Sequence, residues 1–578
     1  MGLIARPCGV LPTLLALLLL SACQSTPTGG GVLQGAPANA TAEWYLAAAE
    51  EAADSGDMVT ARKAYLAAAE LQSASAAYAL GGFYETGTTV DTNRTEAKRW
   101  YQQAADLGHP GAATSVARLL LQDRDVSAAL QVLEPLAADG YAEALFLLGL
   151  LYDDNQLLPA DGAKARNYYT AAAQQGHPTA AYNLGLAWLQ GRGGPADKIK
   201  ALEWLTVSAH AGDADAQGLV GELRYPGPNA VSPDRDAALE WLQAAAEQGN
   251  VRAQYRLAWH YGDGDDVDPE RFLLWLSAAA DGGMAEARFD LALHYRDGTR
   301  VTRDLVRARQ LLEQAASSGL APAANELGLM HARGMGGAVD APQARQFFKQ
   351  AADANDPWGQ FNFALALADG FGGPRDQNGA VSWYCRAADQ QLAPAQTACG
   401  DAYLRGDGVI PDYHQARQRY EAAAAEGDAT AQSGLAAIYL LGLGVEPQPV
   451  RALELSRRAA ESGDGRGQYL LGEIYRTGNG TNSDLKAAAR WYQAAANSGH
   501  LAAQVRLALL YIAGNGVARD PVQAYAWLAT AAANGSEEAN ELRLELARSM
   551  SAPQLSDAKQ AASALQLQLV ASSSGGKR

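Results

Sequence analysis

Residues 465–500 read GRGQYLLGEIYRTGNGTNSDLKAAARWYQAAANSGH, and this stretch decides the fold. Apolar residues recur three and four positions apart in both of its halves, which is the spacing of one buried stripe on an α-helix. A glycine-rich segment at residues 478–480 separates the halves, and Gly499 closes the unit. The stretch therefore predicts two helices joined by a turn.

Comparable units recur along most of the chain. They begin at residues 74, 110, 141, 178, 214, 251, 284, 321, 357, 393, 429, 465 and 501. Two of these units, 110–140 and 251–283, are shorter than the others, and 214–250 carries the unusual segment RYPGPNAVSP. Helical units in tandem bury their stripes against one another, so the repetition predicts a solenoid.

Fixed positions of the unit carry fixed kinds of residue. A small residue in the first helix predicts close approach of a neighbouring helix, at Gly81, Gly149, Gly185, Gly221, Ala258, Ala292, Gly328, Ala364, Gly400, Ala436, Gly472 and Ala508. A large aromatic residue in the second helix is interpreted as core, at Trp100, Tyr168, Trp204, Trp241, Trp275, Phe347, Trp383, Trp491 and Trp527. The residue after each closing glycine, including His109, His177 and His500, is expected to cap the next helix.

The pattern closely resembles the Sel1-like repeat, a relative of the tetratricopeptide repeat, over residues 74–536. The resemblance implies an all-α, right-handed superhelical solenoid of about thirteen repeats, whose first helices line a concave face and whose function is to bind other proteins. Outside the repeats we interpret residues 43–73 as N-terminal capping helices, 537–569 as C-terminal capping helices, and 570–578 as a disordered tail.

The amino terminus predicts export and lipid attachment. The apolar segment at residues 10–20 is too short to span a bilayer and suits a signal peptide over residues 1–22. Leu20-Ser21-Ala22-Cys23 resembles the lipobox of bacterial lipoproteins, which implies that Cys23 is lipidated, and residues 23–42 have the composition of a flexible tether. Gln24 favours an outer-membrane, periplasm-facing location. The alternative is an ordinary secretory signal in which Cys23 is incidental.

Two cysteines remain in the mature chain, Cys385 and Cys399. The repeat alignment places them on the second helix of unit 357–392 and the first helix of unit 393–428. Some Sel1-like proteins bridge this pair of helices closer to the connecting turn, so the resemblance implies a Cys385–Cys399 disulfide in an oxidising compartment. Two buried free thiols are the alternative that the residues leave open.

Aromatic residues gather in one part of the chain and suggest a partner-binding surface. Phe347, Phe348, Phe361, Phe363 and Phe371 lie close in sequence, with Trp358 and Trp383 beside them. Trp358 begins a first helix, where exposed aromatic side chains bind partners. The candidate partner-binding residues are Trp358, Phe361, Phe371 and Trp259; a bulkier core in this unit is the alternative.

The composition is that of a globular protein, with 48% hydrophobic and 19% charged residues, and the net charge of −17 argues against nucleic acid as a partner. No motif predicts a catalytic residue, a metal site or a cofactor. We therefore predict a non-catalytic scaffold, held by lipid at the outer membrane, that binds envelope proteins such as a porin or a secretion component. This architecture resembles the scaffold lipoprotein of alginate-type exopolysaccharide secretion. A carbohydrate- or peptidoglycan-binding module is the alternative, and a β-lactamase-like enzyme is the least favoured hypothesis.

Overall fold

The computed structural model describes residues 36–37, 39–228, 230–262 and 267–575, and these residues form helices connected by turns, without strands. The predicted signal peptide, Cys23 and residues 24–35 of the tether lie outside them. Of the helices in the described ranges, none is both long and apolar enough to cross a membrane. The chain divides into two compact units, Met1–Gly282 and Gly283–Arg578.

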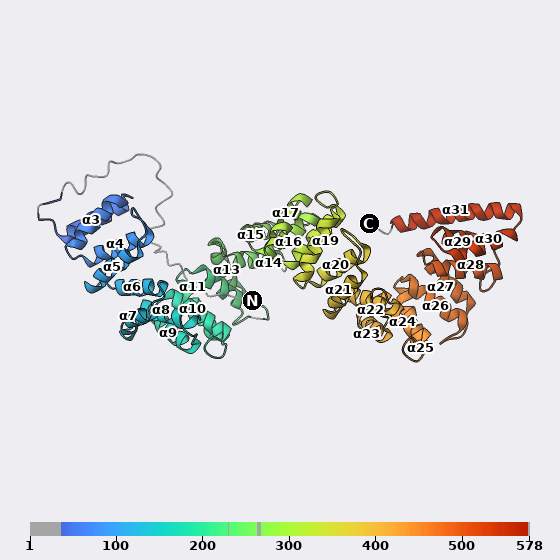
Figure 1. The fold of residues 1–578 in the computed structure, drawn as a ribbon, viewed down its shortest axis with the longest axis horizontal. Coiled ribbons are helices and arrows are strands. Elements are labelled where there is room, and N and C mark those ends of the chain that lie inside the picture. Colours follow the sequence, from blue (N-terminus) through green and yellow to red (C-terminus); the bar gives the residue numbers. More distant parts are fainter. Residues whose placement is uncertain (1–35, 38, 229, 263–266, 576–578) are drawn as a thin grey trace. The chain divides into compact units, whose positions relative to one another are not determined.

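The first unit contains seven helical pairs in its described residues (Figure 1). Their bounds are α2 (Ala42–Asp54), α3 (Met58–Glu70), α4 (Ala74–Thr86), α5 (Arg94–Asp106), α6 (Ala112–Gln122), α7 (Val126–Ala138), α8 (Ala142–Asp153), α9 (Gly162–Gln174), α10 (Pro178–Gln190), α11 (Lys198–His210), α12 (Ala214–Arg224), α13 (Arg235–Glu247), α14 (Val251–Gly262) and α15 (Pro269–Asp281).

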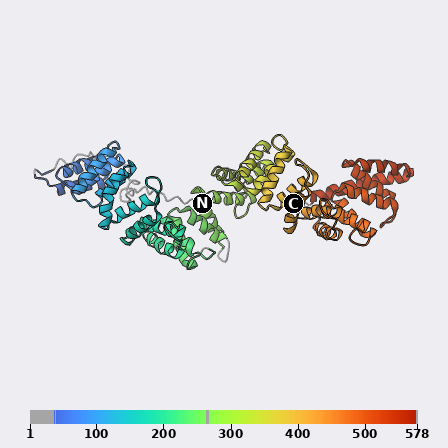
Figure 2. The same ribbon diagram turned by 60° about the horizontal axis from the view of Figure 1, so that its bottom comes forward.

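The second unit contains seven further pairs and two closing helices (Figures 1 and 2). Their bounds are α16 (Ala285–Asp297), α17 (Leu305–Ser317), α18 (Ala321–Arg333), α19 (Ala341–Asp353), α20 (Pro357–Asp369), α21 (Gln377–Asp389), α22 (Ala393–Arg405), α23 (Tyr413–Ala425), α24 (Ala429–Leu441), α25 (Pro449–Glu461), α26 (Gly465–Thr477), α27 (Leu485–Asn497), α28 (Leu501–Ala513), α29 (Pro521–Ala533), α30 (Glu537–Arg548) and α31 (Ala552–Gly575).

The predicted solenoid is confirmed, because each predicted repeat is a pair of packed helices, from α4 and α5 to α28 and α29. The unit 110–140, which lacks the glycine-rich turn, still forms the pair α6 and α7. Successive first helices also contact one another, as α18 does α20 and α24 does α26. The first helices therefore line the inner side within each unit, and we call this side the inner face.

The small residue of the first helix makes room for a side chain of its partner helix. A Cβ atom on Gly472 would lie 2.6 Å from the ring of Tyr492, which is fully buried. A Cβ atom on Gly328 would lie equally close to the ring of Phe348. At these two positions the close packing is thus a ring seated on a glycine, and a larger residue there would collide with the ring.

The aromatic ladder packs on the core as expected, but most of its tryptophans lie at the edge of the core rather than at its centre. Trp100 and Trp527 are buried, but Trp204, Trp241, Trp275, Trp383 and Trp491 are only half-buried. The following residue, such as Tyr384 or Leu242, fills the core instead. Neighbouring residues on a helix point about 100° apart, so only one of them faces the paired helix and the tryptophan lies beside it.

Helix caps hold successive pairs in register. His177 and His500 are N-caps whose Nδ1 atoms accept the backbone N–H groups of Ala180 and Ala503, as the sequence predicts. The same prediction is wrong for His109, because the N-cap of α6 is Gly111, two residues later, whose N–H the Nδ1 atom of His109 accepts. A buried glutamine adds a second tie, since Gln504 Nε2 donates to the carbonyl oxygen at the end of the preceding second helix. These contacts satisfy helix-end groups that would otherwise lack partners.

The carboxy-terminal end differs from the expectation. The helix α31 continues through Gly575, so the predicted disordered tail is wrong for residues 570–575. Leu565 and Leu569 continue the apolar spacing of the helix and pack against the core around α29, which favours helix over coil. At the other end, α2 and α3 occupy the segment predicted as an N-terminal cap, and α3 packs on α4.

Candidate functional site

A groove of about 320 Å³ lies on the inner face of the second unit, between the first helices α16, α18 and α20. We call it the inner-face groove. Its lining residues are Phe289, Pro322, Asn325, Glu326, Leu329, Arg333, Asp356, Trp358 and Asn362. Successive first helices begin 36 residues apart, so Pro322 and Trp358 occupy equivalent positions on neighbouring helices.

Trp358 stands at the rim of the groove with 49% of its surface exposed. Its ring contacts Phe361 edge-on at 6.1 Å between centroids, and Phe361 in turn lies 5.6 Å from Tyr384. Burial raises the pKa of Tyr384 to about 12, as expected for a ring inside the core. Trp358 is therefore an exposed aromatic residue on a rigid support.

The other candidate aromatic residues do not join Trp358 as exposed groups. Phe361 is half-buried and supports Trp358 from below, while Phe371 is half-buried in the turn after α20. Trp259 is 41% exposed but belongs to α14 in the first unit. The structure thus brings Trp358 and Phe361 together and leaves Phe371 and Trp259 outside the groove.

Polar side chains form the middle of the groove. Asn362 Nδ2 donates to Asn325 Oδ1 at 2.8 Å, which links α20 to α18. Glu326 accepts a hydrogen bond from Arg296 of α16, and Arg296 also bonds Asp297. One guanidinium thus serves both carboxylates, and the network as a whole keeps one negative charge.

The two ends of the groove carry different groups. At the Trp358 end, Asp356 caps α20 and accepts the N–H of Gly359 at 2.6 Å. Burial raises the pKa of Asp356, although this hydrogen bond by itself lowers the pKa. At the other end, Arg333 closes α18, is exposed, and forms no hydrogen bond or ion pair with the described residues. The groove thus runs from an aromatic rim to an unengaged guanidinium group.

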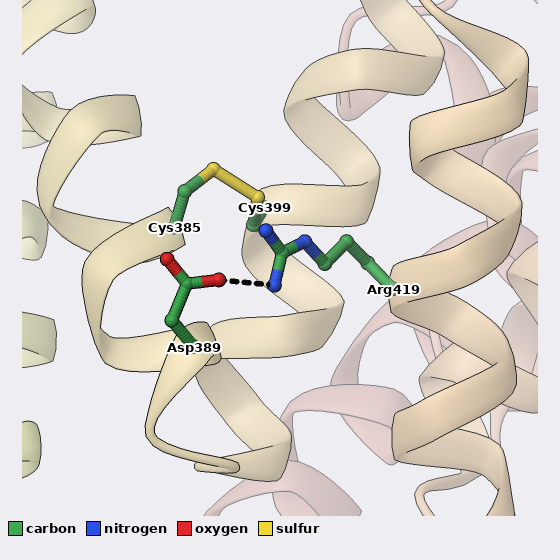
Figure 3. Close-up of a disulfide and its surroundings, with 4 residues drawn as sticks. All are labelled: Cys385, Asp389, Cys399 and Arg419. Carbon is green, nitrogen blue, oxygen red and sulfur yellow. Dashed lines mark hydrogen bonds and ion pairs between the residues drawn. A yellow bond between two sulfur atoms is a disulfide. The ribbon is translucent and has the colours of Figure 1, made fainter.

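A disulfide lies one helix pair away. Cys385 of α21 and Cys399 of α22 are joined, with 5.2 Å between their Cα atoms. Asp389 accepts a hydrogen bond from Arg419 Nη1 at 2.7 Å, so α21 is tied to α22 by the disulfide and to α23 by the ion pair (Figure 3). Cys385 packs against the same core as Phe361 and therefore helps to fix the helices that carry the groove.

A second depression, of about 700 Å³, lies at the start of α27 and is lined by Ser483 and Lys486 among others. These two residues have the Ser-x-x-Lys spacing of serine β-lactamases, which also occurs at Ser556 and Lys559. Ser483 Oγ donates to the carbonyl oxygen of Arg476 at 3.1 Å and has no hydrogen bond with Lys486. A serine nucleophile needs a base within hydrogen-bond reach, and this geometry does not supply one.

Metal-binding chemistry has no candidate in the described part of the chain. Three or more His, Cys, Asp or Glu side chains do not converge anywhere within it. His260 is buried and bonded to Tyr225, while the Nδ1 atom of His294 contacts Thr299. Both histidines thus have hydrogen-bond partners among nearby residues of the protein.

Sequence reasoning did not find the residues that accompany Trp358 in the groove. Asn325, Arg333 and Asn362 lie at positions that vary between repeats, so the repeat pattern does not mark them. The available signal was the repeat alignment itself, because non-core positions four and three apart share one helix face. Comparing those positions on neighbouring helices would have brought Pro322 and Trp358 side by side.

The packed pairs and the groove between their first helices define an α-solenoid of the tetratricopeptide-like class, whose members bind protein partners. The Sel1 repeat model matches the chain at residues 74–109, 142–177, 178–213, 214–250, 251–284, 285–320, 321–356, 359–392, 393–428, 429–464, 465–500 and 501–536. The chain therefore belongs to the Sel1 repeat family. Proteins of this family are repeat scaffolds and are generally non-enzymatic.

Solved structures include relatives of this chain. It is similar to c5321, a protective antigen of uropathogenic Escherichia coli strains that displays an SLR fold, with 32% identity and a TM-score of 0.67 over 78% of this chain and 97% of that chain. It is also similar to a Sel1 repeat protein from Oxalobacter formigenes, with 31% identity and a TM-score of 0.41 over 53% of this chain and 90% of that chain. No curated protein matches the sequence.

Proposed function

We propose that this protein is a non-catalytic scaffold, anchored by lipid at Cys23 in the outer membrane, that holds an envelope protein through its inner-face groove. The observation that carries the proposal is Trp358, which is 49% exposed on a first helix and is supported by Phe361. A large aromatic side chain left exposed over a groove is the usual centre of a protein interface. The lipobox-like tetrad ending in Cys23 supports the location.

The partners we favour are a porin or another secretion component of the envelope, as in the alginate-type systems that the architecture resembles. A polysaccharide or peptidoglycan ligand is the competing function, because exposed tryptophan also stacks on sugars. Capture from detergent-solubilised envelopes separates the two. A protein retained in a Trp358-dependent manner supports the scaffold, whereas retention on a polysaccharide resin without any protein partner supports the competing function.

Replacing Trp358 by alanine is expected to weaken capture of the envelope partner by about 1–3 kcal/mol and to leave the unfolding curve nearly unchanged. The side chain is half-exposed, so its loss removes little core. Val450→Ala is the matched control, since Val450 is 71% exposed on the second helix α25. Lower stability with intact capture would instead assign Trp358 to the fold and contradict the proposed site.

Replacing Cys23 by serine is expected to leave either an unprocessed precursor or a protein in the soluble periplasmic fraction. Stable anchoring requires more than one acyl chain, and a lipoprotein cysteine carries these chains. Cys8→Ser is the matched control, because Cys8 lies in the predicted signal peptide and its loss should change nothing. Fractionation followed by a high-salt wash makes the measurement. Retention of the processed Cys23→Ser protein on the membrane after the wash, or maturation of the parent protein that globomycin does not block, would contradict the lipid anchor.

A further inference from the structure

We propose that the inner-face groove takes an extended peptide segment of the partner, which presents an apolar side chain at Trp358 and a carboxylate at Arg333. The inference rests on the proposed function and specifies the chemistry of the segment that binds. Three features of the groove lead to it: an apolar end, a pair of amides in the middle, and one charge without a partner.

The apolar end is formed by neighbouring first helices. Trp358 of α20 lies at the position equivalent to Pro322 of α18, while Phe289 of α16 is level with the middle of the groove and Leu329 lies one turn before Arg333. The exposed ring of Trp358 and these neighbours provide apolar surface that binding would remove from water. The volume of about 320 Å³ suits one large side chain rather than a folded domain.

The middle of the groove suits a peptide backbone. The hydrogen bond from Asn362 to Asn325 uses one donor and one acceptor of the two side chains. An amide side chain has two N–H donors and an oxygen with two lone pairs, so Asn325 keeps its N–H groups and Asn362 keeps its oxygen for a ligand. A backbone carbonyl and a backbone N–H match this pair, whatever the side chains of the segment are.

The charged end selects an acidic group. Glu326 shares Arg296 with Asp297, and Asp356 accepts the N–H of Gly359, so each carboxylate that lines the groove has a hydrogen-bond donor within the protein. Arg333 is the lining residue whose charge has no partner within the described residues. Asp369 ends α20 at the equivalent position but does not line the groove. A carboxylate accepts two N–H groups from a guanidinium, which makes it the fitting ligand for Arg333.

The length of α18 sets the spacing between the two determinants. Pro322 and Arg333 lie at the two ends of that helix. At 1.5 Å per residue they are about 16 Å apart along the axis, and an extended peptide covers this distance in about five residues. The segment should therefore carry its carboxylate about four or five residues away from its apolar side chain.

Fluorescence anisotropy with labelled synthetic peptides tests the inference on the full-length protein. The probes are peptides of about nine residues in a Gly/Ser background, each with one Phe and one acidic residue at separations from about two to six residues. Matched probes carry Asn or Lys in place of Asp, or Gly in place of Phe. We expect the Phe and Asp peptides to bind best at a separation of about four or five, and to lose affinity when either residue is replaced.

Arg333→Glu is expected to lower the affinity for the Asp peptide about fivefold and to reverse the preference from Asp to Lys. Arg307→Glu is the charge-matched control, because Arg307 is exposed on the second helix α17. Helical content and unfolding of both variants should match those of the parent protein. Equal binding of the Asp and Lys peptides, an unchanged preference in Arg333→Glu, or no binding of any peptide would overturn the inference. The proposed function would survive these results if envelope capture still depended on Trp358.

Discussion

Replacing Tyr420 by alanine is expected to lower the free energy of unfolding around α22–α24 by about 3–5 kcal/mol, which is the range for removing a large buried aromatic ring. Tyr420 is fully buried on α23. Its ring is seated between Gly400 of α22 and Gly434 of α24. A Cβ atom added to Gly400 would lie 3.0 Å from the ring, and one added to Gly434 would lie 2.6 Å from it. Neither glycine has a side chain that could fill the cavity.

The hydroxyl group of Tyr420 adds a second contribution. It donates to Asp401 of α22, which also lies 3.4 Å from Arg405 and 3.5 Å from Arg466 of α26. Burial, together with the charge of Asp401, raises the pKa of Tyr420 well above its ordinary value, so the phenol stays protonated and remains a donor. Loss of the ring thus also removes a donor from a half-buried carboxylate.

Native-state hydrogen exchange is the suitable measurement, because a long repeat array does not unfold as one two-state body. Tyr420→Phe keeps the ring and should cost about 1.5–3 kcal/mol, the value of a hydrogen bond to a charged group. Tyr413→Ala is the control on the same helix, since Tyr413 is 40% exposed. Equal protection in Tyr420→Ala and Tyr413→Ala would show that the ring does not join the repeats.

The repeat pattern predicted the helices well because each position of the pattern has a local physical cause. The first helix α26 begins at Gly465 and α28 at Leu501, where the predicted units begin. His500 caps a helix as expected, because the side chain that follows the closing glycine is already beside the free N–H groups. Length, spacing and caps are properties of one unit and can be read from one unit.

The features that the sequence did not predict depend on neighbouring helices. The hydrophobic period locates a stripe but does not choose between adjacent positions, which is why Trp383 was expected in the core and Tyr384 fills it. The groove likewise needs residues from three first helices, and no single unit contains it. Arg333 is identified as a candidate binding residue only when the three helices are seen together, because only then is it clear that its charge has no partner among the described residues.

The end of the fold also differs from the sequence interpretation. Residues 570–578 are interpreted from the sequence as a tail, whereas α31 continues to Gly575, and its Leu565 and Leu569 pack on the core around α29. In a solenoid the last stripe must be covered by something other than a further repeat. The helix α31 meets this need for α29, and it is longer than any repeat helix in the described residues.

Ending the chain after Gly535 is expected to destabilise the last repeat by about 3 kcal/mol or more and to cause self-association. This truncation removes α30 and α31 and uncovers α29, whose Trp527 and Leu528 are almost completely buried. Exposed apolar stripes of this kind pair with one another in water. The measurements are sedimentation velocity for association and hydrogen exchange of α28 and α29 for stability.

A substitution separates the role of α31 from the loss of chain length. Ala558 is fully buried in α31, so Ala558→Asp places a carboxylate in the packed interface and should detach the helix. Lys559→Asp is the matched control, since the neighbouring Lys559 is exposed. We expect Ala558→Asp to reproduce the self-association and the faster exchange in α29, and Lys559→Asp to reproduce neither. A truncated protein that stayed monomeric and kept its protection in α29 would show that the last repeat does not need α30 and α31 as a cap.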